Sequence, residues 1–173
     1  VYTPQHGTGY VPVTTVLNRL GYKLIEVKEQ CEPRGDFINT KSPNPEEKGA
    51  YELAIEYARK HNADMICCTD PDCDRIGIVL FDKENNPVYM TGNQTGAILI
   101  NYLLSTRKEL KILPENGIMY NTIVSSPLGA KVASLYGVET EQTLTGFKYI
   151  GDKIARAIEN NGKVFQIGYE ESY

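Results

Sequence analysis

Three aspartates alternate within five residues of the chain, in the peptide Asp-Pro-Asp-Cys-Asp-Arg that spans residues 70–75. In an extended or gently curved backbone, positions i, i+2 and i+4 project to one side, so the three carboxylates are expected to converge. Like charges a few ångströms apart repel one another unless a cation neutralises them. Oxygen-only ligation suits Mg²⁺ or Ca²⁺, and the peptide therefore predicts a divalent-metal site with Asp70, Asp72 and Asp74 as ligands. Arg75 is placed to steady a phosphate oxygen at a coordination position that the carboxylates leave open.

Other interpretations of the acidic peptide fit less well. An EF-hand calcium loop needs glycine at its sixth position and glutamate at its twelfth, where this chain has Arg75 and Phe81. A phosphatase of the D-x-D type needs threonine or valine after the second aspartate and a strand that runs directly into a helix. Here Asp74 and Arg75 lead into a second strand-like segment. A solvated acidic turn without an ion stays open as an alternative.

Two further peptides carry groups that suit a polar substrate. Thr145-Gly146-Phe147-Lys148 follows a strand-like run and opens a helix. The exposed backbone amides at the helix start and the nearby lysine therefore form a candidate anion-binding site. Gly168-Tyr169-Glu170-Glu171-Ser172 ends a strand-like run, and its carboxylate and hydroxyl groups match the hydrogen bonds of a sugar diol. A plain strand-to-helix turn and a polar strand end are the respective alternatives.

The elements that must position these peptides alternate between strand-like and helix-like patterns. Strands are predicted at 1–3, 23–27, 65–69, 76–81, 118–125, 139–143 and 164–169. Helices are predicted at 13–20, from Pro45 with Asn44 as N-cap, and at 94–104, 128–136 and 149–160. This alternation favours an α/β fold of two consecutive α/β/α layered domains with mostly parallel (mixed) sheets, at 1–91 and 92–173. In such sheets, ligand chemistry collects at the carboxyl ends of strands, where all three peptides lie.

Bulk properties exclude several classes of protein. The net charge of −4 provides no basic field for a nucleic acid. No run approaches the roughly 18 apolar residues that a membrane span needs, and no signal-peptide pattern is present. No C-x-x-C pair occurs among the four cysteines, so buried reduced thiols and a cytoplasmic location are expected. The start at Val1, without methionine, suggests a piece of a longer protein.

The acidic peptide between two apolar strands resembles the D-G-D-x-D-R metal loop of the α-D-phosphohexomutases. Pro71, where many members carry glycine, looks like the subgroup that contains phosphoglucomutases and phosphopentomutases. Residues 145–148 resemble the family's T-G-x-K loop, residues 168–172 its G-E-x-S sugar loop, and His6-Gly7-Thr8-Gly9 the H-G-x-G segment that opens its second domain. The motifs occur in family order, and the resemblance covers almost the whole chain.

The resemblance implies a role for each motif. Asp70, Asp72 and Asp74 would bind Mg²⁺ together with a phosphoserine oxygen, with Arg75 in support. The substrate would be contacted by Thr145, Gly146 and Lys148, and Phe147 would form a wall of the substrate cleft. Glu170 and Ser172 would bind sugar hydroxyls, while His6 would shape a tight turn before a helix.

The resemblance also implies an activity, which is the interconversion of sugar 1-phosphate and 6-phosphate, or pentose 1- and 5-phosphate. The reaction would pass through a phosphoserine and a bisphosphate such as glucose 1,6-bisphosphate. Neither a serine loop like T-A-S-H-N-P nor a phosphate loop like R-P-S-G-T occurs in the 173 residues. The chain is therefore expected to supply domains two and three, to depend on a first and a fourth domain, and to be inactive alone. A phosphomannomutase fragment and a non-catalytic cation- or sugar-binding module remain as alternatives.

Overall fold

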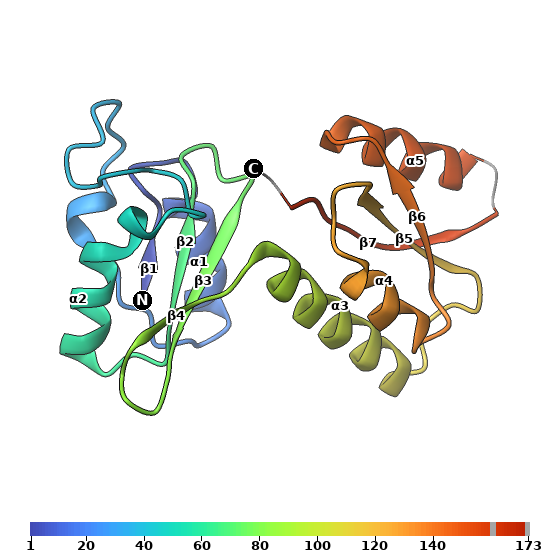
Figure 1. Ribbon diagram of the computed structural model, residues 1–173, viewed down its shortest axis with the longest axis horizontal. Coiled ribbons are helices and arrows are strands. Elements are labelled where there is room, and N and C mark those ends of the chain that lie inside the picture. The colour runs from blue at the N-terminus through green and yellow to red at the C-terminus, as the bar shows by residue number, and fades with distance from the viewer. Residues whose placement is uncertain (160–161, 172–173) are drawn as a thin grey trace. The chain divides into compact units, whose positions relative to one another are not determined.

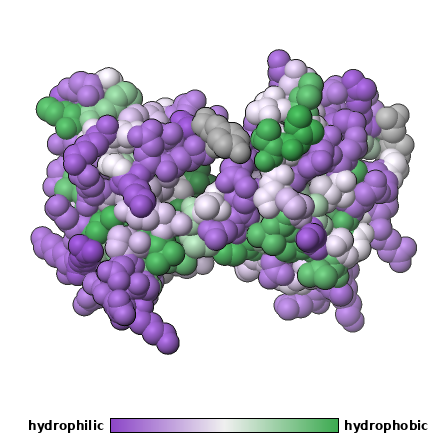
Figure 2. Space-filling view, viewed as in Figure 1, coloured by the Kyte–Doolittle hydropathy of each residue, from purple (hydrophilic) through white to green (hydrophobic). Residues whose placement is uncertain are grey.

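The computed structural model describes residues 1–159 and 162–171, and the chain divides into two compact units, Val1–Thr91 and Gly92–Tyr173 (Figure 1). Both units combine helices with a β-sheet, so the predicted α/β class is confirmed. On the face drawn in Figure 2, the surface of each unit is mainly hydrophilic, with smaller apolar patches. Among the described residues, no helix combines the length and the apolar character that crossing a bilayer requires.

The first unit is built on a mixed four-stranded sheet in the order β1-β2-β3-β4. Its strands are β1 (Tyr2–Thr3), β2 (Met65–Thr69), β3 (Ile76–Phe81) and β4 (Pro87–Tyr89). β1 and β2 are parallel, whereas β2–β3 and β3–β4 are antiparallel. The helices are α1 (Tyr10–Arg19) and α2 (Glu52–His61), with 3₁₀ turns η1 (Lys28–Gln30) and η2 (Lys48–Tyr51). The acidic peptide is thus the connection of the β2–β3 hairpin.

The core of the first unit lies between α2 and one face of this sheet. Ala54 and Ala58 are spaced four residues apart, so they line one face of α2. They pack against the buried side chains of Ile66, Cys68 and Val79. Because small alanines let the helix approach closely, β2 is held firmly up to the point where the acidic peptide begins.

Two expectations for the first unit are wrong in detail, and one strand was not predicted. Residues 23–27 form no strand and contribute only an isolated bridge between Tyr2 and Glu26. Helix α2 begins at Glu52, because the Asn44 side chain accepts a hydrogen bond from the backbone amide of Glu46 in a tight turn instead of capping a helix. The run after the hairpin turn adds the short strand β4, and Pro87 at its start is acceptable on the outermost strand.

The second unit has a parallel three-stranded sheet in the order β6-β5-β7. Its elements are α3 (Gly92–Glu109), β5 (Gly117–Thr122), α4 (Pro127–Ser134), β6 (Glu139–Thr143), α5 (Phe147–Glu159) and β7 (Val164–Gly168). Every residue of the central strand β5 is buried. Ile100 and Leu104 of α3 pack with Met119 on one side of the sheet, while Ile150 of α5 packs with Ile118 and Tyr120 on the other.

The two units share one order of elements. In the second unit, β5 is followed by α4, the parallel strand β6, α5 and the parallel strand β7. In the first unit, β1 is followed by α1, the bridge at Glu26, α2 and the parallel strand β2. The acidic peptide after β2 and the Gly-Tyr-Glu-Glu peptide after β7 therefore leave equivalent strands of their units.

Candidate functional site

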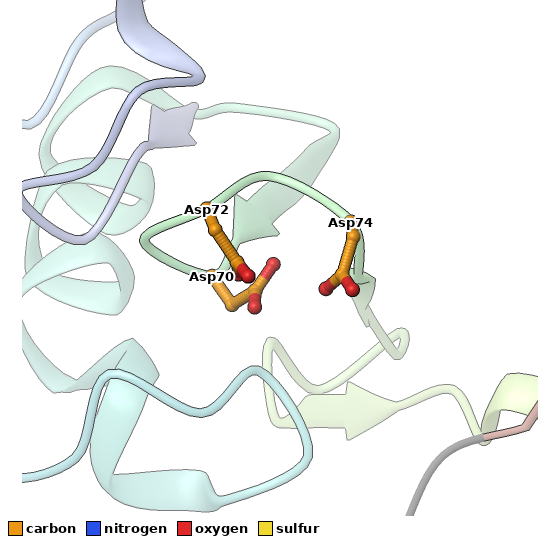
Figure 3. A group of neighbouring side chains, drawn as sticks. All are labelled: Asp70, Asp72 and Asp74. Atoms are coloured by element: carbon orange, nitrogen blue, oxygen red, sulfur yellow. The ribbon is translucent and has the colours of Figure 1, made fainter. Parts of the chain in front are cut away.

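The three aspartates of the hairpin loop converge. Asp70, Asp72 and Asp74 each offer a carboxylate oxygen, and these oxygens lie within 4.8 Å of one another. Figure 3 shows the carboxylates on the same side of the loop. The convergence was predicted, but its cause is a tight turn and not strand alternation: the Cys73 amide donates to the Asp70 carbonyl at 3.1 Å, and Cys73 has a φ of 64°.

The electrostatics of this cluster differ from one aspartate to the next. Asp70 is buried, which by itself raises its pKa, but hydrogen bonds with Asp72 and Arg75 outweigh burial and leave the pKa lowered. The pKa of Asp72 is raised because it shares a hydrogen bond with Asp70 and lies beside the charges of Asp70 and Asp74. Mutual repulsion of carboxylates is what a bound cation relieves, so an all-oxygen set with this spacing fits a hard divalent ion.

Arg75 is directed at the cluster by contacts on both sides. Its backbone amide and Nε donate to the two carboxylate oxygens of Asp70 at 2.9 and 3.1 Å. Its Nη1 donates to the Oδ1 of Asn44 at 3.2 Å. Sequence reasoning assigned Arg75 to a phosphate and missed Asn44, because nothing in the Pro-Asn-Pro turn indicates a partner 31 residues away. In this structure the arginine orients the buried carboxylate.

His6 lies in the turn that precedes α1, as expected. It is buried, has a φ of 61°, and its Nδ1 lies 2.8 Å from the Glu32 carbonyl oxygen. These contacts tie the turn to the segment around residue 32, and the backbone role predicted for His6 agrees with this placement.

In the second unit, the two candidate sugar peptides are joined directly. The amide of Gly146 donates to the Oε1 of Glu170 at 3.0 Å. The amide that was expected to seat a substrate anion is thus already bonded to a carboxylate of the protein. Thr145 and Lys148 are exposed beside it, and the Lys148 ammonium lies 5.0 Å from the centre of the Tyr149 ring. Ser172, the other predicted sugar ligand, lies outside the described residues.

The adjacent carboxylate is used differently. Glu171 accepts a hydrogen bond at 3.2 Å from the backbone amide of Asn93, in the first turn of α3. A carboxylate is favourable there because the first amides of a helix lack partners within the helix. The Asn93 Oδ1 in turn accepts from the amide of Ser126, the N-cap residue of α4, at 2.9 Å. Asn93 and Glu171 were not singled out from the sequence.

Tyr169 directly precedes these glutamates in the sequence, and its ring is closely packed. Its ring faces two helical glycines: an added Cβ at Gly96 would lie 2.9 Å from its Cε2, and one at Gly129 would lie 2.4 Å from its hydroxyl oxygen. Glycine is needed at both places because any side chain would displace the ring. A pair of glycines inside predicted helices was the only available signal for this contact.

Two family models match nearly the whole chain. The model described as Phosphoglucomutase/phosphomannomutase, alpha/beta/alpha domain II matches residues 1–83, and the corresponding model of domain III matches residues 91–173. The chain belongs to the phosphoglucomutase/phosphomannomutase family. The resemblance inferred from the short peptides is confirmed.

Curated relatives of this phosphoglucomutase/phosphomannomutase family chain include phosphoglucomutases of two staphylococci. The protein of Staphylococcus epidermidis (strain ATCC 12228 / FDA PCI 1200) is 42% identical over all of this chain, and that of Staphylococcus aureus (strain USA300) is 37% identical. The chain spans 31% and 30% of the lengths of these relatives.

Solved structures of the phosphoglucomutase/phosphomannomutase family share the fold at low sequence identity. A family protein of Burkholderia thailandensis matches 98% of this chain with a TM-score of 0.73 and 18% identity, the chain covering 33% of that protein. A putative phosphomannomutase of Thermus thermophilus matches 99% of it with a TM-score of 0.66 and 18% identity, the chain covering 35% of that protein. These similarities show that the fold is that of the family.

Proposed function

We propose that this chain is the metal- and sugar-binding part of a phosphoglucomutase-type enzyme that interconverts sugar 1-phosphate and sugar 6-phosphate. The observation that carries the proposal is the convergence of three carboxylates within 4.8 Å at the end of a buried strand. The names of the curated relatives favour glucose phosphates over mannose phosphates. Pentose 1- and 5-phosphates remain a second candidate substrate class.

Asp70, Asp72 and Asp74 are proposed to hold Mg²⁺. A bound Mg²⁺ would offset negative charge on a phosphoryl group during its transfer. Asp70 suits the role of first ligand because its carboxylate is already oriented by two hydrogen bonds from Arg75. The exposed side chains of Asp72 and Asp74 would complete the set of carboxylate ligands. An Aspergillus fumigatus relative, 14% identical with a TM-score of 0.65, has been solved with GlcNAc-6P and magnesium, which supports this cofactor.

Thr145, Gly146, Lys148, Glu170 and Ser172 are proposed to bind the sugar. The hydrogen bond between Gly146 and Glu170 joins the loop after β6 to the loop after β7 at the carboxyl edge of the second sheet. The exposed Lys148 would add a positive charge for a phosphate, and the carboxylate of Glu170 would accept bonds from sugar hydroxyls. Glucose 1,6-bisphosphate is proposed as the intermediate, since it occupies another solved Aspergillus fumigatus relative.

The catalytic serine is proposed to belong to a separate first domain, and a fourth domain to bind phosphate. Neither a Ser-His peptide nor an Arg-Pro-Ser-Gly peptide occurs in the 173 residues. The four cysteines are free, which suits the reducing cytoplasm where we place the enzyme. A mixture of the chain with glucose 1-phosphate and glucose 1,6-bisphosphate is therefore expected to form no glucose 6-phosphate. Sustained Mg²⁺-dependent conversion would refute the assignment of the serine to another domain.

Calorimetric titration with Mg²⁺ tests the metal assignment. The chain is expected to bind one ion, and Asp72→Asn is expected to remove the binding signal. Asp64→Asn is the matched control, because Asp64 is an exposed aspartate outside the cluster and its substitution makes the same change in charge. A wild-type chain that binds no Mg²⁺, or an Asp72→Asn variant that binds normally, would rule the metal site out and leave an acidic turn.

A further inference from the structure

We propose that the Gly7-Thr8-Gly9 segment is the support that positions the acidic loop and thereby sets its affinity for a divalent cation. This inference rests on the proposed metal function, and it assigns a positioning role to residues outside the proposed ligand set of Asp70, Asp72 and Asp74. The segment lies at the start of α1, more than 60 residues from the loop in the sequence.

Thr8 ties the loop to this support through a single acceptor. Its backbone amide donates to the Pro71 carbonyl oxygen at 2.8 Å, and its hydroxyl donates to the same oxygen at 3.2 Å. Pro71 is the residue between Asp70 and Asp72, so these bonds fix the backbone that links the first two proposed ligands. A backbone carbonyl oxygen has two lone pairs, so it can accept from both donors at once.

The two glycines provide room for the loop to approach. An added Cβ at Gly7 would lie 2.3 Å from both the Cα and the carbonyl oxygen of Pro71. An added Cβ at Gly9 would lie 2.8 Å from the Sγ of Cys73 and 2.6 Å from the hydroxyl of Tyr2. Gly9 has a φ of −65°, so glycine is required there for space and not for backbone conformation. Cys73 therefore packs against the support while its two neighbouring aspartates stay exposed.

The support is itself anchored at a strained turn. Gln5 and His6 are consecutive residues with positive φ, 49° and 61°. Such conformations persist only where the surroundings enforce them, and they gather at functional sites. The Gln5 side chain donates to the Ala50 carbonyl at 2.7 Å, and the His6 amide donates to the Gln30 carbonyl at 2.8 Å. The turn is thus bonded to two separate parts of the unit before it reaches the loop.

Binding of Mn²⁺, followed by the electron paramagnetic resonance signal of the free ion, tests the proposal on the full chain. Gly9→Ala should weaken Mn²⁺ binding about 10-fold, the low end of what the loss of a supporting contact costs a metal site. Thr8→Val removes only the hydroxyl bond and should weaken binding by a smaller factor. Gly35→Ala is the matched control, because an added Cβ there meets nothing within 4 Å, and it should bind like the wild type.

The outcomes separate this proposal from the one on which it rests. Wild-type chain that binds no Mn²⁺ would overturn the metal function itself. If the wild type binds while folded Gly9→Ala and Thr8→Val variants keep its affinity, the support is refuted and the metal site stands. Equal weakening by Gly35→Ala would likewise refute it. Should Gly9→Ala fail to fold, judged by circular dichroism, the exposed Thr8→Val variant decides.

Discussion

The backbone amide of Gly146 donates a hydrogen bond to the side chain of Glu170 across 24 residues, at 3.0 Å. Gly146 has a φ of 120°, a conformation that strongly favours glycine. The glycine in the Thr-Gly-Phe-Lys peptide is thus needed so that its amide can face the neighbouring loop. Glu170 connects the exits of β6 and β7, which lie on opposite sides of β5.

This bond should be visible in amide exchange. Glu170→Ala removes the acceptor, so we expect the Gly146 amide to exchange faster with deuterium, because a bond to a charged acceptor stabilises by about 1.5–3 kcal/mol. Glu170→Gln keeps a side-chain oxygen at the same place and should retain most of the protection. Exchange at Gly146 measured by NMR checks the pair, and unchanged protection in Glu170→Ala would contradict the contact.

Two helical glycines should respond to alanine in opposite ways. Gly129→Ala places a methyl group 2.4 Å from the Tyr169 hydroxyl and should destabilise the second unit by about 1–3 kcal/mol. Gly151→Ala, in the exposed part of α5, meets nothing within 4 Å and should stabilise by about 0.5–1 kcal/mol. Urea unfolding of both variants measures the difference. Equal effects would show that Tyr169 does not occupy the space over Gly129.

Removal of the Arg75 side chain should destabilise the first unit in a way that Mg²⁺ partly reverses. Arg75→Met leaves the buried Asp70 carboxylate with one fewer donor, which costs about 1–3 kcal/mol. A bound cation would supply the missing charge, so added Mg²⁺ should raise the melting temperature of the variant.

The control for that variant is an exposed pair of the same chemistry. Arg34 and Asp36 form a bridge with both side chains about half exposed, at 42% and 54%, so Arg34→Met should change stability little. Melting temperatures with and without Mg²⁺ compare the two variants. An Arg75→Met variant no less stable than Arg34→Met would contradict the orienting role of Arg75.

Stability should fall steeply at alkaline pH. Burial raises the pKa of Cys67 to about 11 and of Cys68 to about 12, from 9.0, and it also raises the pKa of Tyr2 and Tyr51. For the cysteines, the stabilisation is fully present below pH 9.0 and is lost progressively up to about pH 12, because the unfolded chain releases these protons first. Urea midpoints measured from pH 8 to pH 11 should therefore decline, whereas a flat profile would show that these groups are accessible to solvent.

Much of the site could be predicted because its signals are local. The alternating aspartates, the Thr-Gly-Phe-Lys peptide and the Gly-Tyr-Glu-Glu peptide identify themselves by residue type and short spacing. Helix and strand periodicity likewise depends on neighbouring residues, so α1, β2, β3, α4 and β6 were found near their observed places. The predicted strand at 23–27 failed because it makes only one bridge to β1, and short-range pattern does not report whether a partner strand is in reach.

The sequence by itself determined which chemical groups this protein carries, the α/β class and the family, because these follow from side-chain identity and local pattern. Only the tertiary structure decided how the groups are used. It directs the Asn44 side chain to Arg75 instead of to a helix end. It also pairs Glu170 with the Gly146 amide and Glu171 with the Asn93 amide. Finally, it brings Thr8 within hydrogen-bond distance of the Pro71 carbonyl. Each of these contacts joins residues more than 20 positions apart, so its existence depends on how the elements pack and not on the residues that flank it.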